Sequence, residues 1–149
     1  MPSNVELFCD GACIGNPGPG GGAYLLRLRT ANGDQEKEGC GAEAETTNNR
    51  MELKGAIEGL KALKRPCSVN LYCDSQYVAK GINCWLAAWK QKGWRKADNK
   101  PVLNAELWQE LDCLLNIHKV EAFWIKGHSG HKENERVDSM ARKVIAPLG

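Results

Sequence analysis

Two apolar runs that end alike constrain most strongly what this chain can fold into. Leu-Phe-Cys-Asp stands at residues 7–10 and Leu-Tyr-Cys-Asp at residues 71–74. If both runs are strands lying side by side and parallel, Asp10 and Asp74 meet at the same sheet edge, where open α/β sheets bind ligands. Taken singly, Asp10 could belong to a turn with Gly11, and Asp74 could merely cap a helix. The repeated ending favours a shared site.

Hydrophobic periodicity predicts an α/β fold around these two runs. Alternation predicts five strands, at residues 4–10, 23–29, about 35–43, 68–73 and 119–125, with a Gly/Pro-rich turn at 11–22. Helical periodicity predicts four helices, from near Thr47 to before Pro66, from Asp74-Ser75 to about Trp85, from Asn104 onward, and over the segment that carries Val137, Met140 and Ala141. The first three strands read as an antiparallel meander, and the whole order suggests a mixed sheet with helices on both faces.

The length and composition fit one compact domain. The chain has 149 residues, of which 42% are hydrophobic and 26% charged. No apolar run approaches the roughly 20 residues that a membrane span needs, and the first residues show no secretory signal, so we expect a cytoplasmic protein. Seven cysteines without a Cys-x-x-Cys pair argue against a zinc site and a disulfide framework.

Basic and aromatic residues gather between Lys80 and Lys100. This window holds six basic residues against one acidic residue, Asp98, and therefore carries a net charge of +5. It also contains Trp85, Trp89 and Trp94. Such interleaving suits a polyanion with flat bases, although a solvated helix face over core tryptophans is an equally good interpretation of the window alone.

Two further carboxylates have unusual positions on the predicted helices. At about 100° per residue, Glu52 falls on the flank of the apolar stripe, whereas Glu58 falls on the solvent side. Asp138 lies similarly on the flank of the last helix. If these two converge with Asp10 and Asp74, their mutual repulsion requires a cation. Oxygen ligands without His or Cys favour Mg²⁺ or Mn²⁺ over zinc, and carboxylate-bound magnesium suits phosphoryl chemistry.

Several runs together resemble bacterial ribonuclease H of type 1, in order and over nearly the whole chain. The run at residues 46–53 contains the highly specific Asn-Asn-Arg-Met-Glu-Leu at 48–53, and the other runs are residues 8–11, 15–21, 74–78, 126–128 and 133–138. The resemblance implies a five-stranded mixed sheet, three antiparallel strands followed by two parallel ones, flanked by helices. It implies that the metal-binding and catalytic carboxylates are Asp10, Glu52, Asp74 and Asp138.

The same resemblance assigns roles to other residues. It implies that His128, between glycines, assists proton transfer or product release. It implies that Asn48 and Gln76 contact the minor groove of an RNA–DNA hybrid, and that Asn16 and Thr47 help to hold its backbone, although Thr47 and Asn48 could equally cap a helix. It finally implies a basic protrusion, or handle, at about residues 86–101. The expected substrate contacts in and beside this protrusion are Trp85, Lys90, Lys92, Trp94, Arg95 and Lys96.

The function implied is endonucleolytic hydrolysis of the RNA strand of RNA–DNA hybrids, leaving 5′-phosphate and 3′-hydroxyl ends. We expect two Mg²⁺ ions per site with substrate, Mn²⁺ as a substitute, no membrane association and no obligate protein partner. A non-catalytic hybrid-binding module and another nuclease of the same fold are the alternatives. Residues 18–23 also fit a relaxed dinucleotide-binding pattern, but that motif must open a helix, and here it precedes a predicted strand.

Overall fold

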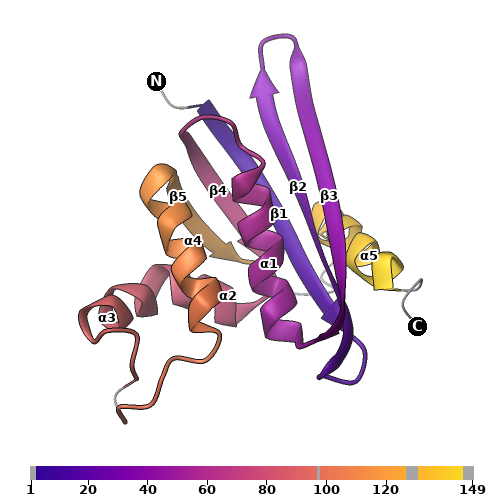
Figure 1. Ribbon diagram of the computed structural model, residues 1–149. Coiled ribbons are helices and arrows are strands. Elements are labelled where there is room, and N and C mark those ends of the chain that lie inside the picture. Colours follow the sequence, from indigo (N-terminus) through magenta and orange to yellow (C-terminus); the bar gives the residue numbers. More distant parts are fainter. Residues whose placement is uncertain (1–2, 97, 127–130, 146–149) are drawn as a thin grey trace.

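A five-stranded mixed sheet lies at the centre of the fold. The computed structural model describes residues 3–96, 98–126 and 131–145. The strands are β1 (Ser3–Cys13), β2 (Gly18–Thr30), β3 (Gly33–Thr46), β4 (Cys67–Cys73) and β5 (Lys119–Trp124), in the order β3-β2-β1-β4-β5. The first three are antiparallel, and β4 and β5 run parallel to β1 and to each other. The predicted sheet is confirmed (Figure 1).

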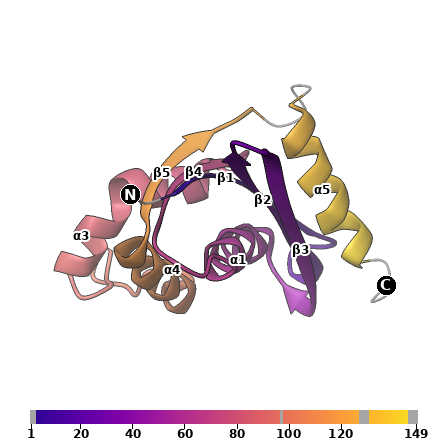
Figure 2. The ribbon, with the colours of Figure 1, turned by 90° about the horizontal axis from the view of Figure 1, so that it is seen from above.

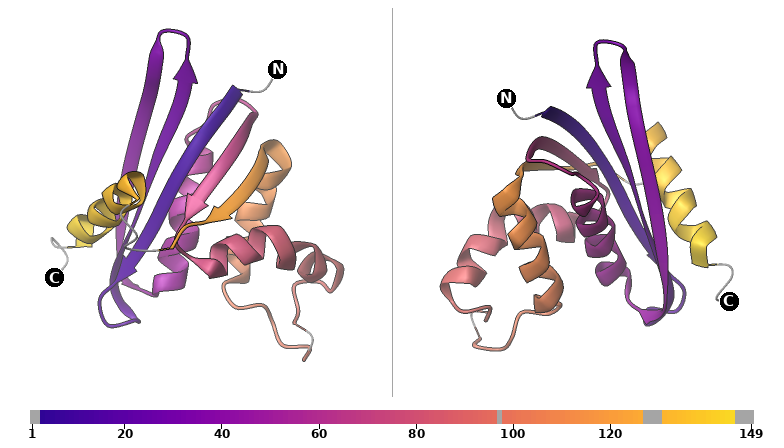
Figure 3. Two further views of the ribbon diagram at one scale, coloured as in Figure 1. Left: turned by 180° about the vertical axis from the view of Figure 1, so that it is seen from behind. Right: turned by 45° about the horizontal axis from the view of Figure 1, so that its top comes forward.

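Helices cover the two faces of the sheet unequally. Viewed from above, α1 (Asn48–Lys61) and α4 (Ala105–Ile117) lie on one face and α5 (Lys132–Ile145) on the other (Figure 2). From behind, α5 crosses the antiparallel part of the sheet (Figure 3). None of the helices in the described ranges is long and apolar enough to cross a bilayer.

The helix predicted to end near Trp85 is longer than expected. It consists of α2 (Gln76–Lys80), a π-helical turn at Gly81–Trp85 and α3 (Leu86–Gln91). A Cβ atom on Gly81 would come within 2.0 Å of the Trp108 ring, so the backbone of this segment lies directly on α4. The helix predicted to extend from near Thr47 to just before Pro66 is α1, and it already ends at Lys61.

Alternation along β1 divides the core into two layers. Leu7 and Cys9 are fully buried on the α1 side, together with the predicted stripe of Leu53, Ala56, Ile57 and Leu60. Phe8 points to the other side and packs with Val137 and Ala141 of α5. Each fully buried aliphatic side chain contributes about 1.5–3 kcal/mol relative to exposure. Both helices are thus fixed on β1, the strand that carries Asp10.

The prediction of a Gly/Pro-rich turn at residues 11–22 is wrong at both ends, because β1 extends to Cys13 and β2 already begins at Gly18. Gly11 belongs to β1, and Gly20, Gly21 and Gly22 pair with Cys13, Ala12 and Gly11 in the ladder between β1 and β2. These glycines permit close packing instead of a turn conformation. A Cβ atom on Gly21 would lie 2.3 Å from the carbonyl oxygen of Ala141 in α5. A Cβ atom on Gly11 would lie 2.4 Å from the backbone nitrogen of Glu52 in α1.

This packing predicts a large difference between two glycine substitutions. Gly21→Ala should destabilise the protein by about 2–3 kcal/mol, because the added methyl group meets backbone that cannot move away cheaply. Gly41→Ala is the matched control, since a Cβ atom there meets nothing within 4 Å; it should be neutral or slightly stabilising. Urea denaturation monitored by circular dichroism measures both, and equal stabilities would contradict the packing argument.

Candidate active site

The sheet brings Asp10 and Asp74 together as the repeated endings predicted. The parallel register pairs Phe8 with Tyr72, so Asp10 and Asp74, each two residues further on, lie level at the carboxyl edge. Asp10 is 2% exposed. Asp74 is not the cap of the following helix, because the Ser75 side chain accepts the hydrogen bond from the backbone nitrogen of Val78 at 3.2 Å. The capping interpretation of Asp74 is therefore wrong.

Glu52 reaches the same point from the helix above the sheet. The Thr47 side chain caps α1 by accepting a hydrogen bond from the backbone nitrogen of Arg50 at 3.2 Å. The missing side chain of Gly11 lets the first turns of α1 approach β1, which carries Glu52 over the sheet edge. Glu52 is only 4% exposed. One oxygen each of Asp10, Glu52 and Asp74 lie within 4.8 Å of one another.

This carboxylate cluster (Asp10, Glu52 and Asp74) is electrostatically unsatisfied. One oxygen of Asp10 accepts the Gly11 amide at 2.8 Å. The other, Oδ2, and Oε2 of Glu52 are buried without a hydrogen-bond partner in the described part of the chain. Burial, and next the nearby charge of Asp74, raise the pKa of Asp10 to about 8. Burial and the charge of Asp10 raise the pKa of Glu52 well above its usual range. The three side chains offer only oxygen ligands, and two of these oxygens are buried without a partner. Such a ligand set fits a hard divalent cation.

The raised pKa values predict that the metal-free protein loses stability as the pH rises. A carboxyl group with a raised folded-state pKa favours the folded state below its unfolded pKa of about 4, and this stability is lost as the pH rises through the folded pKa. For Asp10 the window therefore runs from about pH 4 to about pH 8. Urea denaturation in EDTA should show a decline on the order of a few kcal/mol across this window.

Two controls test the source of this decline. Asp10→Asn should make the profile shallower, because asparagine does not ionise and of these two buried carboxyl groups only Glu52 still titrates. Glu58→Gln, on the exposed side of α1, should leave the profile unchanged. A profile in Asp10→Asn as steep as that of the unaltered protein would contradict the assignment to this site.

Asp138 lies at the rim of the cluster. Its carboxylate pairs with Arg142, one helical turn further along α5, at 3.1 Å. The proximity of Asp138 contributes to the raised pKa of Asp10. The structure thus brings three of the four predicted carboxylates together and holds the fourth beside them, where Arg142 competes for it. Asp138 as a metal ligand remains a prediction, and His128 lies outside the described residues.

The predicted substrate contacts Asn16 and Asn48 meet at the start of α1. The side-chain oxygen of Asn16 accepts the backbone N–H of Asn48 at 2.8 Å, which fixes the loop before β2 onto the helix. Asn48, at the start of α1, and Gln76, at the start of α2, are both exposed. Asn48, Asp138 and Arg142 also line a hollow of about 390 Å³ beside the cluster. Thr47 serves as the N-cap, so the capping interpretation is confirmed for this residue.

The basic protrusion extends from the lower end of the helical layer. After α3 the chain forms a loop that returns through a bridge between Arg95 and Pro101 (Figure 1). Lys92, Arg95 and Lys96 are exposed, whereas the Lys90 ammonium pairs with Asp112 at 3.3 Å. The tryptophans are partly buried: Trp85 packs on Trp89, Trp89 packs edge-on against Trp108, and Trp94 lies against the core. The window therefore combines a solvated basic loop with aromatic residues that anchor it.

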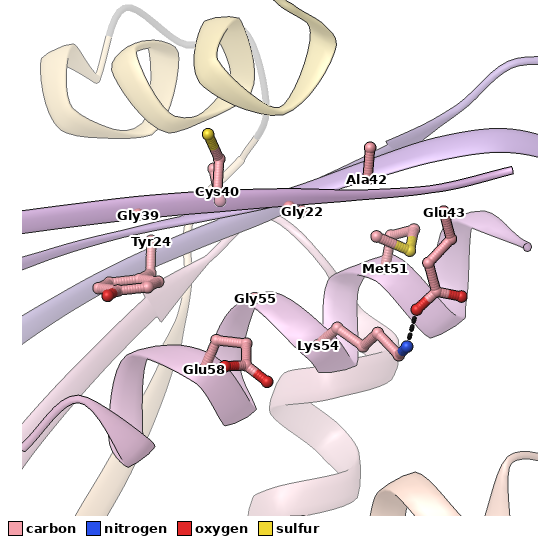
Figure 4. A pocket seen from close by; sticks show the side chains of 12 residues that line it. Gly22, Tyr24, Gly39, Cys40, Ala42, Glu43, Met51, Lys54, Gly55 and Glu58 are labelled. Atoms are coloured by element: carbon pink, nitrogen blue, oxygen red, sulfur yellow. Dashed lines mark ion pairs between the residues drawn. The ribbon is translucent and has the colours of Figure 1, made fainter. Parts of the chain in front are cut away.

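A separate pocket lies between α1 and the edge strand β3. It has a volume of about 330 Å³, and its walls include Tyr24, Met51 and the ion pair of Lys54 with Glu43. In Figure 4 the Cys40 side chain points away from this pocket, toward the opposite face of the sheet. None of the predicted site residues lines it, so this pocket is distinct from the carboxylate cluster.

Comparison with known proteins identifies the family. A family model described as RNase H matches residues 2–146. The chain belongs to the ribonuclease H family. Ribonuclease H of Rhizobium johnstonii is 58% identical over 145 residues, which cover 97% of this chain and 93% of that protein. Ribonuclease H of Dechloromonas aromatica is 57% identical, with coverages of 97% and 95%.

Solved structures agree with this ribonuclease H fold. LC9-RNase H1, described as a type 1 RNase H with the type 2 active-site motif, superimposes with a TM-score of 0.90 at 31% identity, over the whole of this chain and 75% of that one. LC11-RNase H1, solved in complex with RNA/DNA hybrid, shares the fold with a TM-score of 0.73 at 18% identity, with coverages of 96% and 97%. The resemblance inferred from the motifs is confirmed. As a ribonuclease H, this chain is a hydrolase, and its family uses a divalent metal.

Two neighbours of the site escaped prediction from the sequence. Arg142 stands four residues after Asp138, a spacing typical of a helical ion pair, so this contact could have been inferred. Trp124 at the end of β5 donates its indole N–H to the carbonyl of Asp74 at 3.1 Å. That contact depends on the register of β5 against β4, for which the sequence contains no signal.

Proposed function

We propose that Asp10, Glu52, Asp74 and Asp138 hold two Mg²⁺ ions when substrate is bound, with Mn²⁺ as a substitute. The enzyme is an endonuclease of the RNA strand of RNA–DNA hybrids. The observation that carries the metal assignment is the cluster of three carboxylates with buried, unpartnered oxygens. When bound, the metals supply Lewis-acid polarisation of the phosphate and activation of water. Hydrolysis then leaves a 5′-phosphate and a 3′-hydroxyl.

The protein's own residues orient the hybrid. Glu52 lies in the carboxylate cluster with Asp10 and Asp74, and we propose that it contacts a 2′-hydroxyl at the cut site. Amides can donate and accept at base edges and 2′-hydroxyls in the minor groove, and this supports Asn48 and Gln76 as minor-groove contacts. Asn16 uses its side-chain oxygen for Asn48, and its NH₂ group is proposed to contact the backbone of the hybrid. His128 is proposed to assist proton transfer or product release.

The basic protrusion is proposed to grip the DNA strand. Lys92, Arg95 and Lys96 supply exposed charge at a distance from the carboxylates, which repel phosphates until metal binds. Trp85 and Trp94 supply partly buried rings that shape the base of the protrusion. Lys90 is the least available contact, since it already pairs with Asp112. We further propose that residues 1–149 form one catalytic domain that acts as a monomer, and its cytoplasmic location stays a prediction.

One panel of digestions tests the function. Labelled RNA–DNA hybrid, duplex DNA, duplex RNA and single strands are incubated with Mg²⁺, with Mn²⁺ or with EDTA. We expect cleavage only of the RNA within the hybrid, only with metal, and with 5′-phosphate ends. Hybrid binding without any cleavage would support the non-catalytic module instead. Cleavage of duplex DNA or branched DNA in preference to hybrid would point to another nuclease of the same fold.

A further inference from the structure

The side chain of Trp124 is unusually exposed for a tryptophan next to a catalytic edge. It is 48% exposed at the last residue of β5. Its indole N–H nevertheless has a defined partner, the main-chain carbonyl of Asp74, at 3.1 Å. Buried or half-buried indoles usually place this N–H on a specific acceptor. Here the acceptor belongs to a member of the carboxylate cluster.

Asp74 is the member of the cluster that most needs such support. Asp10 lies within β1 and Glu52 within α1, and both side chains are buried. Asp74, in contrast, follows the last residue of β4 and precedes Ser75, the N-cap of α2, and it is half-buried. Its peptide unit therefore lies in a strand-to-helix turn, where neither the ladder of β4 nor the turns of α2 set its orientation directly.

The end of β5 secures this turn with two consecutive hydrogen bonds. Cys73 is paired with Trp124 in the last register position between β4 and β5. The backbone nitrogen of Ile125 donates to the Cys73 carbonyl at 2.7 Å, and the indole of Trp124 donates to the next carbonyl, that of Asp74. Fixing the Asp74 peptide plane also fixes the direction in which its Cα–Cβ bond aims the carboxylate.

We propose that Trp124 is a positioning residue that orients Asp74 for metal binding through its indole N–H. This inference rests on the proposed metal-binding role of the carboxylate cluster. Groups that orient metal ligands through hydrogen bonds typically change metal affinity or activity by about 10–100-fold when they are removed. Loss of the N–H should therefore weaken metal binding more than it weakens the fold.

The test measures Mn²⁺ affinity by calorimetry on the substrate-free protein. Trp124→Phe should lower the affinity by about 10-fold. Phe123→Leu is the matched control: it changes an aromatic residue of the same strand that stacks on Tyr72, and it should keep the affinity within about twofold of the unaltered protein. Thermal denaturation in EDTA monitors the fold, and the stabilisation gained on adding Mn²⁺ should be smaller in Trp124→Phe, because it depends on affinity.

A second variant separates the N–H from the ring. Replacing Trp124 by 3-benzothienylalanine keeps the size and shape of the ring system and removes only the donor, so it should match Trp124→Phe. Mn²⁺ affinity equal to that of the unaltered protein in this variant would overturn the inference. So would a rise in KM for hybrid with unchanged Mn²⁺ affinity, which would mark Trp124 as a stacking surface. Failure of the unaltered protein to cleave hybrid would instead refute the proposed function.

Discussion

Asp10→Asn should remove nearly all cleavage of the RNA–DNA hybrid while the protein stays folded. The amide is neutral and a poor ligand for Mg²⁺, and metal assistance supplies several kcal/mol of transition-state stabilisation. At about 1.4 kcal/mol per tenfold in rate, the loss should reach about 10³-fold. Because the site buries an unpartnered oxygen of Asp10, the variant should be at least as stable as the parent in EDTA at pH 8.

Rate and stability must be measured together for this variant. Single-turnover cleavage of labelled hybrid gives the rate, and urea denaturation in EDTA gives the free energy of unfolding. Glu58→Gln removes an exposed carboxylate from α1 and should change neither. Cleavage by Asp10→Asn within a few-fold of the parent would show that Asp10 is not a metal ligand. A large loss of stability would mean that lost activity reports unfolding instead.

The triple variant Lys92→Ala, Arg95→Ala and Lys96→Ala should raise KM for hybrid and nearly keep the maximal rate. These three side chains are exposed on the protrusion, so they can bind phosphates without touching the reacting atoms. Binding that is lost equally from the ground state and the transition state changes KM alone. Each phosphate contact also contributes about 0.9 to the slope of log affinity against log salt. The slope should therefore become shallower by up to about 3 units.

A control with the same change in charge is available at the opposite end of the sheet. Lys64, Arg65 and Lys119 are exposed near the start of β4 and β5, whereas the cluster follows the end of β4. Changing these three to Ala should leave KM and the salt slope nearly unaltered. Arg95 also donates to the Asn99 carbonyl at 3.0 Å and so holds the loop. The double variant Lys92→Ala and Lys96→Ala leaves this hydrogen bond of Arg95 intact. It should still make the salt slope shallower by up to about 2 units.

An unchanged salt slope in both protrusion variants would remove the protrusion from substrate binding. The charges would then only solvate a loop, and the tryptophans would only fill the space beside α4. The metal-site argument would survive this outcome, because it depends on β1, α1 and β4 alone.

Periodicity carried most of the prediction of the fold and the carboxylate cluster. Alternation along β1 and β4 is strong, so Asp10 and Asp74 could be placed at one edge before the register was known. The stripe of α1 placed Glu52 on the flank that faces the sheet, and its burial confirms that placement. These inferences depend on residues close in sequence, because their spacing along a strand or helix determines which face each side chain lies on.

Contacts that depend on tertiary packing could not be predicted in the same way. Glycine runs usually indicate turns, so the strand at Gly20, Gly21 and Gly22 was missed: the helices that pack on it come from distant parts of the chain. The continuation of the helix beyond Trp85 depends on Gly81 fitting against Trp108, a contact between separate helices. The ion pair of Asp138 with Arg142, in contrast, lies within one helix, and the spacing of four residues could have predicted it.

The glycines that pair between β1 and β2 have a consequence for how sequences of this kind can diverge. At Gly11, Gly21 and Gly22, main-chain atoms of α1 and α5 lie against main-chain atoms of the sheet. At these glycines, direct contact between main-chain atoms sets the distance from each helix to the sheet. Substitution of core side chains therefore does not change this distance for the helices that carry Glu52 and Asp138. Leucines and valines deeper in the core can drift in size over evolutionary time while the frame of the carboxylates keeps its dimensions. The core side chains therefore tolerate substitution, whereas the glycine contacts between β1 and β2 keep the geometry of the carboxylates accurate.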